Sequence, residues 1–254
     1  MGMIKLFYLA ILVIVVFFIY SCSNSSNSVS SFNFDYVSYR ILIPLYSYPS
    51  DPVYSPEYNK LLNFRYPTKV DIILNPDNGP GQSVDANFSM IIQQLKSKGY
   101  FLLGYIPTNY SNRNIDDVKR DVDKYENFYE VFDGYFFDEV SNDIQTLSYY
   151  SSIYNYVKLK NKAVYFNPGT VVPGDFYSIC DKVVVAEVDL QSFYRDYSNY
   201  VVNPKDCFLI YGVGNSQFYQ CLSFLKDIGA KCFYIIDEDP PSWFKVSPYL
   251  NIIF

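Results

Sequence analysis

From residue 39 onward, short apolar runs alternate with longer amphipathic stretches. The runs are rich in β-branched and aromatic residues and are almost unbroken by polar ones. They begin at Tyr39 (YRILIPLYSY), Lys69 (KVDIILNP), Tyr100 (YFLLGYIPT), Gly134 (GYFFDEVS), Ala163 (AVYFNPG), Lys182 (KVVVAEVD), Asp206 (DCFLIYGVG) and Lys231 (KCFYIIDED). Unbroken apolar runs of this length are typical of β-strands that are buried on both faces of a sheet.

The stretches between these runs carry helix signals. The clearest are SVDANFSMIIQQLKSKG, from Ser83, and NIDDVKRDVDKYENFY, from Asn114. The first ends at Gly99 after two lysines, a typical helix stop, and the second starts at Asn114 with acidic residues in its first turn. NSQFYQCLSFLKDIGAK, from Asn215, repeats the order of helix, glycine and strand. The stretch after FNPGTVVP predicts only a weak, short helix.

Eight strands that alternate with helices, without a break in composition, predict a single α/β domain, a (β/α)8 TIM-type barrel. The chain length of 254 residues suits one such barrel. An open doubly wound sheet is the alternative. It is disfavoured because no glycine-rich phosphate loop follows the first run, where PLYSYPSDP is rich in proline instead.

The N-terminus has a different pattern. Lys5 precedes an apolar stretch, residues 6–20, which matches a signal-peptide core and is shorter than a membrane span of roughly 20 residues. IYSC, which ends at Cys22, resembles a bacterial lipobox with Cys22 as the lipidated residue. We therefore expect a signal peptide or lipoprotein signal or anchor over residues 1–22, a Ser/Asn-rich tether over residues 23–36 and the barrel over residues 37–254. This predicts an extracellular or cell-surface domain.

Composition excludes several classes of function. The chain has no histidine, which removes Ser-His-Asp and Cys-His nucleophiles and histidine-based metal sites. Its net charge of −6 argues against a nucleic-acid partner, because such proteins bind through basic patches. Aromatic residues form 20% of the chain, and tyrosine suits sugar rings because it combines an apolar face with a hydroxyl group.

Four cysteines follow the tether: Cys180, Cys207, Cys221 and Cys232. Their spacing fits no zinc pattern. In an exported chain they allow three disulfide pairings, and a buried free thiol is an equal alternative for each.

In a barrel of this type, the active site is built at the C-terminal ends of the strands and in the loops after them. The polar residues at those predicted ends are Tyr46, Asn75, Tyr105, Asp138, Glu139, Asn167, Glu187, Tyr211, Asp237 and Glu238. The opposite ends carry ordinary solvating residues such as Lys69, Lys182 and Lys231. Polar chemistry is therefore concentrated on one rim.

The acidic residues of this rim are unusual for strand ends. Glu187 lies inside VVVAEV, where an unpaired charge is costly, so it must be near water, paired, or protonated with a raised pKa. The alternative is a structural Glu187 bonded to amides or arginine. Asp138 and Glu139 are adjacent, and adjacent strand residues point to opposite faces, so both can face the axis only if the strand has turned. The alternatives for that pair are ordinary solvation at a strand end, or Asp138 as the cap of the next helix.

Three carboxylates at one mouth, with many tyrosines and no histidine, suit glycosidic bond cleavage. One carboxylic acid protonates the leaving oxygen, and a carboxylate attacks or activates water. The candidate catalytic residues are therefore Asp138, Glu139 and Glu187. A weaker alternative is a calcium or magnesium site built from Asp138, Glu139, Asp237, Glu238 and Asp239. The chain has no looped Asp-x-Asp-x-Asp pattern that would favour it, and we expect neither a metal nor another cofactor.

Five motifs, IPLYSYP, ILNPDNGPG, LGYIPTNYSNR, DGYFFDEVSN and FNPGT, resemble in this order the spherulin-4 (spherulation-specific family 4) proteins, which are related to fungal galactosaminogalactan hydrolases. The resemblance runs from about Ile41 to the C-terminus. It implies a (β/α)8 barrel that cleaves an exopolysaccharide containing α-1,4-linked N-acetylgalactosamine. It also implies activity for the acidic pair that ends the fourth strand and a glutamate on the sixth, which are Asp138, Glu139 and Glu187 here.

The same resemblance implies sugar contacts at the rim. With the rim residue Asp237, the predicted substrate-binding set is Tyr46, Asn75, Tyr105, Asn167, Tyr211 and Asp237. Two departures from the family pattern concern the substrate loops: VDL follows Glu187, and the eighth run ends in IIDED.

The function expected from the sequence is an exported, endo-acting glycoside hydrolase for an amino-sugar exopolysaccharide. We expect a monomer whose partner is the polysaccharide, with membrane contact only through the N-terminal anchor or a lipidated Cys22. A non-catalytic glycan-binding or cell-surface interaction protein on the same barrel is the main alternative. A structural surface protein, whose tyrosines pack between neighbours, is the third.

Overall fold

The computed structural model describes residues 39–63, 69–239 and 243–253. Within these residues, eight parallel strands close into a barrel, each pairing with the next along the chain and β8 pairing with β1. The predicted (β/α)8 barrel is therefore confirmed, and the open doubly wound sheet is wrong. The expected signal or anchor (1–22) and tether (23–36) lie outside the described residues.

Every strand lies within one of the eight predicted apolar runs. The strands are β1 (Arg40–Leu45), β2 (Lys69–Leu74), β3 (Phe101–Pro107), β4 (Gly134–Asp138), β5 (Ala163–Phe166), β6 (Lys182–Asp189), β7 (Asp206–Tyr211) and β8 (Cys232–Ile235). In β1 and β2, every residue after the first is buried, as expected for strands covered on both faces.

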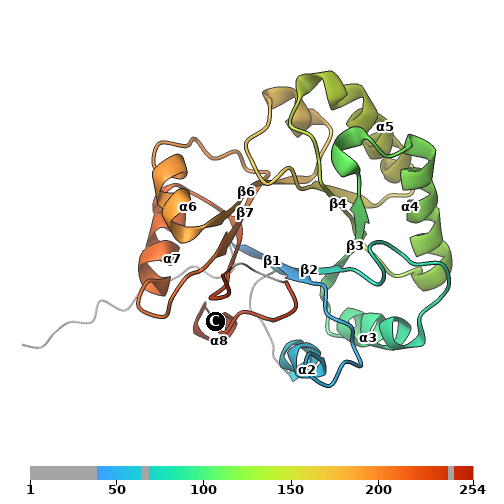
Figure 1. The fold of residues 1–254 in the computed structure, drawn as a ribbon, viewed down its shortest axis with the longest axis horizontal. Coiled ribbons are helices and arrows are strands. Elements are labelled where there is room, and N and C mark those ends of the chain that lie inside the picture. The colour runs from blue at the N-terminus through green and yellow to red at the C-terminus, as the bar shows by residue number, and fades with distance from the viewer. Residues whose placement is uncertain (1–38, 64–68, 240–242, 254) are drawn as a thin grey trace, which may run out of the picture. The chain divides into compact units, whose positions relative to one another are not determined.

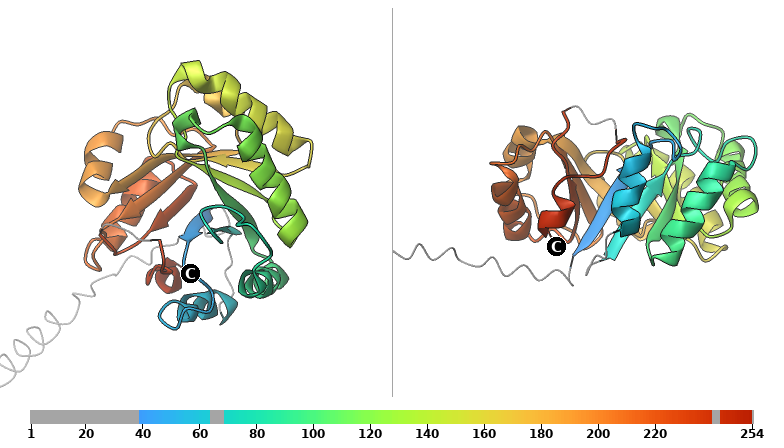
Figure 2. Two further views of the ribbon diagram at one scale, coloured as in Figure 1. Left: turned by 45° about the vertical axis from the view of Figure 1, so that its right-hand side comes forward. Right: turned by 90° about the horizontal axis from the view of Figure 1, so that it is seen from below.

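Helices surround the strands, as Figures 1 and 2 show. The α-helices are α2 (Ser55–Asn63), α3 (Ala86–Ser97), α4 (Ile115–Tyr129), α5 (Leu147–Lys158), α6 (Leu190–Tyr197), α7 (Phe218–Asp227) and α8 (Leu250–Ile253). Short 3-10 turns lie at η2 (Asn109–Ser111), η3 (Ile144–Thr146) and η4 (Gly174–Ser178). The weak helix expected after β5 is the short turn η4.

The helix boundaries follow from local chemistry. Asn114 caps α4 by accepting a hydrogen bond from the backbone N–H of Asp116, and Asp189 caps α6 in the same way. After α3, Gly99 takes a φ of +87°, a conformation that glycine adopts without steric cost. The two capping residues set where α4 and α6 begin, and Gly99 sets where the chain leaves α3.

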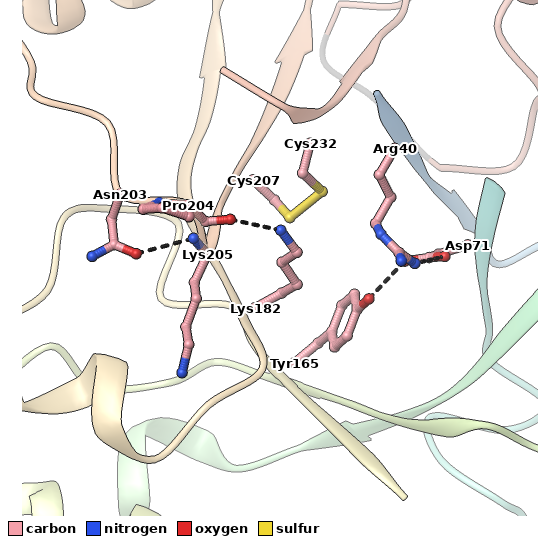
Figure 3. Close-up of a disulfide and its surroundings, with 9 residues drawn as sticks. All are labelled: Arg40, Asp71, Tyr165, Lys182, Asn203, Pro204, Lys205, Cys207 and Cys232. Carbon is pink, nitrogen blue, oxygen red and sulfur yellow. Dashed lines mark hydrogen bonds and ion pairs between the residues drawn. A yellow bond between two sulfur atoms is a disulfide. The ribbon is translucent and has the colours of Figure 1, made fainter. Parts of the chain in front are cut away.

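An internal polar cluster lies at the N-terminal end of the barrel (Figure 3). Asp71, on β2, is fully buried, forms an ion pair with Arg40 on β1, and accepts a 2.7 Å hydrogen bond from the Tyr165 hydroxyl on β5. Burial raises the pKa of the Asp71 carboxyl, and the Arg40 guanidinium opposes that shift by hydrogen bonding and by charge. We refer to Arg40, Asp71 and Tyr165 as the base cluster.

A disulfide joins Cys207 on β7 to Cys232 on β8 beside this cluster (Figure 3). Cys180 and Cys221 are buried free thiols. Burial raises the pKa of each of these thiols to about 12, so neither carries appreciable thiolate near neutral pH. Of the alternatives left open by the sequence, the structure thus combines one pairing with two free thiols.

Among the described residues, no helix is long and apolar enough to cross a bilayer.

Candidate active site

Five of the predicted site residues meet in one cavity at the C-terminal end of the barrel. Asp138, Glu139, Asn167, Glu187 and Tyr211 line it, together with Tyr110, Trp243 and the turn formed by Pro168 and Gly169. The cavity has a volume of about 400 Å³. Because all eight strands are parallel, their C-terminal ends share this face, and strands β4 to β7 contribute side chains to it.

Asn167 connects the two carboxylates at the centre of the cavity. Its side-chain Nδ2 donates to Asp138 Oδ1 and to Glu187 Oε2, at 2.8 Å in both cases. Its Oδ1 accepts from the backbone N–H of Gly169 at 3.0 Å, so the amide group is held with its nitrogen toward the acids. The two bonded carboxylate oxygens can therefore be no farther apart than twice 2.8 Å.

Neutral donors occupy the other oxygen of each carboxylate. The Tyr105 hydroxyl donates to Asp138 Oδ2 at 2.8 Å, and Trp243 Nε1 donates to Glu187 Oε1 at 3.0 Å. A chain of hydrogen bonds thus runs from β3 through Asp138, Asn167 and Glu187 to the segment after β8. No cationic side chain is among the cavity-lining residues that the structure describes.

A second set of contacts joins the ends of this chain. The Tyr46 ring, which follows β1, packs edge-on against Tyr105 with centroids 5.2 Å apart. The Tyr46 backbone N–H donates to the Trp243 carbonyl at 2.7 Å. Tyr46 therefore supports both outer donors, Tyr105 and Trp243, rather than lining the cavity itself.

A β-bulge sets the register of Glu187. The pairing of β6 with β7 shifts between Val184 and Ala186, which leaves Val185 as the extra residue. The Tyr197 hydroxyl donates to the Val185 carbonyl. Because side chains alternate along a strand, one extra residue reverses the face to which every following side chain points. The bulge is therefore what brings Glu187 into the cavity at this register.

Glu139 reaches the same cavity because the strand has turned. Its backbone adopts a φ of +53°, in the left-handed region that non-glycine residues rarely occupy. Its Oε2 accepts from the backbone N–H of Asn109 at 3.1 Å. Because the strand has turned at this point, the adjacent residues Asp138 and Glu139 can face the same side, and both line the cavity.

Burial dominates the electrostatics of the two bridged acids. It raises the pKa of Asp138, against the opposing hydrogen bonds from Tyr105, the Glu139 backbone and Asn167. It also raises the pKa of Glu187, where Asn167 and Trp243 oppose the shift and the negative charge of Asp138 adds to it. Raised carboxyl pKa values of this kind suit a group that must deliver a proton.

Two predicted contacts lie elsewhere. Asn75 is outside the cavity, and its Oδ1 accepts from the Gly79 backbone N–H at 2.9 Å, which shapes the loop after β2. Asp237 is exposed and is likewise not among the cavity-lining residues. Tyr110 and Trp243 were not among the site residues predicted from the sequence. Trp243 is the only tryptophan of the chain, and that rarity was the one available signal.

The geometry gives no support to the calcium or magnesium site considered as an alternative. Within residues 39–63, 69–239 and 243–253, no group of three or more His, Cys, Asp or Glu side chains is placed to hold a metal ion.

The fold and the site together define a (β/α)8-barrel protein with bridged carboxylates at its mouth. The sequence pattern of spherulation-specific family 4 matches residues 40–253. The chain therefore belongs to this family. It is 30% identical over 166 residues to Spherulin-4 of Physarum polycephalum, and the match covers 64% of this chain and 48% of that protein. The chain thus spans about half the length of this curated relative.

Solved structures show the same barrel. Sph3 of Aspergillus clavatus, in complex with GalNAc, has a TM-score of 0.75 and 23% sequence identity, covering 85% of this chain and 96% of its own. The spore cortex-lytic enzyme SleL of Bacillus cereus has a TM-score of 0.51 and 9% identity, covering 85% of this chain and 73% of its own. At these identities the likeness bears on the fold.

Proposed function

We propose that this protein is an exported glycoside hydrolase that cleaves an amino-sugar polysaccharide between sugar units. The observation that carries the proposal is the pair Asp138 and Glu187, both joined to Asn167 Nδ2 at 2.8 Å in one cavity. Glycosidic cleavage needs two carboxyl groups on either side of one bond, one able to give a proton and one able to stay ionised.

The contacts favour different roles for the two acids. Asp138 accepts hydrogen bonds from Tyr105, Asn167 and the Glu139 backbone, which all stabilise its ionised form. Among the described residues, Glu187 has only two donors, Asn167 and Trp243. A neighbouring acid raises the pKa of each group, Glu139 that of Asp138 and Asp138 that of Glu187, so the number of donors is the difference between them. We therefore assign Asp138 as the ionised carboxylate and Glu187 as the general acid, with one proton shared by the pair at working pH.

The separation favours retention of anomeric configuration. In retaining enzymes the two carboxyl groups lie about 5–5.5 Å apart, whereas inverting enzymes need about 6.5–9.5 Å to admit a water. The limit of twice 2.8 Å between the oxygens bonded to Asn167 lies below the second range. Asp138 would then attack the sugar carbon, and water would release the product in a second step.

The substrate class and the location rest on other support. Sph3 of Aspergillus clavatus, a fold relative, was solved with GalNAc, which supports an N-acetylgalactosamine polymer as the first substrate to test. The disulfide between Cys207 and Cys232 supports an exported domain, because such bonds persist in oxidising compartments.

The test is incubation with a panel of exopolysaccharides that includes α-1,4-linked N-acetylgalactosamine polymers, with product mass analysis. The wild-type protein should release short oligosaccharides, and Glu187→Gln should release none while its circular dichroism spectrum stays unchanged. Measurable binding without any product over long incubation would replace the hydrolase with the non-catalytic glycan-binding alternative.

A further inference from the structure

The loop after β3 is strained at three consecutive residues. Asn109, Tyr110 and Ser111 have φ values of +47°, +52° and +71°, and none of them is glycine. A non-glycine residue held in this region is strained and persists only where surrounding contacts determine its conformation. Two things therefore need an explanation: which contacts hold these three residues in this conformation, and which function the conformation serves.

The cause is a set of hydrogen bonds to the acidic pair. Thr108 donates through its backbone N–H to the Asp138 carbonyl at 2.9 Å and through Oγ1 to the Glu139 carbonyl at 2.8 Å. The Tyr110 N–H donates to the same Glu139 carbonyl at 2.7 Å. With the bond from Asn109 to Glu139 Oε2, the loop is fixed to the backbone beside the reactive Asp138.

The strained loop presents the Tyr110 side chain to the cavity, and packing within the protein does not explain this position. Tyr110 is 57% exposed and lines the cavity with Asp138 and Glu187. Among the described residues, its ring has no aromatic neighbour and its hydroxyl has no hydrogen-bond partner, unlike Tyr105 and Tyr46 nearby. The strain thus holds an open aromatic face beside the acids.

We propose that Tyr110 is a sugar-binding platform, whose ring stacks on the apolar face of a pyranose unit adjacent to the one held at Asp138 and Glu187. This rests on the proposed function. A tyrosine ring suits this ligand because it offers an apolar face and a hydroxyl at its edge. Glu139 is then a positioning residue for Tyr110 as well as a cavity-lining acid, since both its carboxylate and its carbonyl hold the loop.

The platform should affect longer chains and not single sugars. In the full chain carrying Glu187→Gln, to prevent turnover, calorimetry would measure the affinity for N-acetylgalactosamine and for its α-1,4-linked oligosaccharides. Adding Tyr110→Ala should weaken binding of the oligosaccharides about tenfold and leave the monosaccharide unchanged, whereas Tyr110→Phe should stay close to the parent. The matched control is Tyr219→Ala on α7, a tyrosine of similar exposure (54%) outside the cavity, which should change nothing.

A stability readout separates this role from a structural one. Tyr110→Gly should raise the melting temperature, because glycine relieves a positive φ, and should weaken oligosaccharide binding as Tyr110→Ala does. Lower melting temperature with unchanged binding would overturn the proposal, as would failure of the parent variant to bind any of the oligosaccharides. Binding that depends on Tyr110 without product from the wild-type protein would refute the hydrolase alone.

Discussion

Each end of the barrel holds an aspartate that accepts a hydrogen bond from a tyrosine, but the other neighbours of the two aspartates differ. Asp71 at the base is fully buried, and Asp138 at the mouth is partly buried. In the base cluster, Asp71 accepts from Tyr165 at 2.7 Å and pairs with the Arg40 cation. At the mouth, Asp138 accepts from Tyr105 at 2.8 Å and otherwise meets only neutral donors and another acid. An aspartate and a tyrosine are thus hydrogen-bonded at each end of the barrel, and what differs is the rest of the surroundings.

The difference lies in how the buried charge is compensated. The Arg40 guanidinium partly offsets the cost of burying the Asp71 carboxylate, although burial still raises the pKa of that group. Removing either residue would leave the other without its ion-pair partner, and in this sense the base cluster supports the fold. Amide, hydroxyl and indole groups orient the mouth acids without neutralising them, so protonation remains an available response to burial. This is the pattern expected when one end holds the fold and the other does chemistry.

The largest expected effect is on turnover at the mouth. Glu187→Gln and Asp138→Asn should each lower the rate on a confirmed substrate by about 10³-fold, because each removes one half of the acid and base pair. The measurement is the release of reducing ends. Asp71→Asn, the matched change at the base, should keep its activity per folded molecule. Near wild-type turnover in either mouth variant would contradict the roles assigned here.

The next effect is on stability at the base. Asp71→Ala should lower the free energy of unfolding by about 3–5 kcal/mol, because it leaves the partly buried Arg40 without its partner. Denaturant titration measures this change. A loss below about 1 kcal/mol would mean that the base cluster is not the stabilising element we describe.

The disulfide should contribute slightly less. Cys207 and Cys232 are 25 residues apart, for which closing the loop is worth about 3.5 kcal/mol. A reductant should lower the melting temperature of the wild-type protein, and equally that of a Cys180→Ala/Cys221→Ala variant. A Cys207→Ala/Cys232→Ala variant should not respond to it. If the first pair of substitutions removed the response instead, the pairing would be wrong.

The smallest effect concerns pH and stability at the mouth. The pKa of Glu187 is raised in the folded state, so the native protein holds a proton that the unfolded chain releases, and stability falls as pH rises from about 4. Glu187→Gln removes that loss. Its melting temperature should exceed that of the wild type at pH 7, and the gain should shrink toward zero below pH 4. Thermal scans across this range give the comparison, and a constant difference would argue against it.

The sequence predicted the strands and helices at both ends of the barrel better than it predicted the side-chain contacts there. Buried strands need continuous apolar runs, so all eight strands lay within the predicted runs, and the capping signal at Asn114 gave the start of α4. Parallel strands also place their C-terminal ends together, which was enough to group Asp138 with Glu187.

Contacts made across long sequence separations could not be predicted in this way. Trp243 bonds Glu187 from 56 residues away, and Asp71 bonds Tyr165 from 94 residues away. The bulge at Val185 has no glycine or other local signal to reveal it. Asn75 was expected at the sugar, yet its side chain serves its own loop, because asparagine readily bonds nearby backbone.

The central claim is that burial beside neutral hydrogen-bond donors raises the pKa values of the mouth acids. Trp243, the only tryptophan, donates its indole N–H to Glu187 Oε1 at 3.0 Å, so its fluorescence reports the ionisation of that group. A pH titration of tryptophan emission should show a midpoint above the ordinary glutamate value of about 4.3, which persists in Asp71→Asn and disappears in Glu187→Gln. A midpoint at or below that value, or one that survives in Glu187→Gln, would contradict the account.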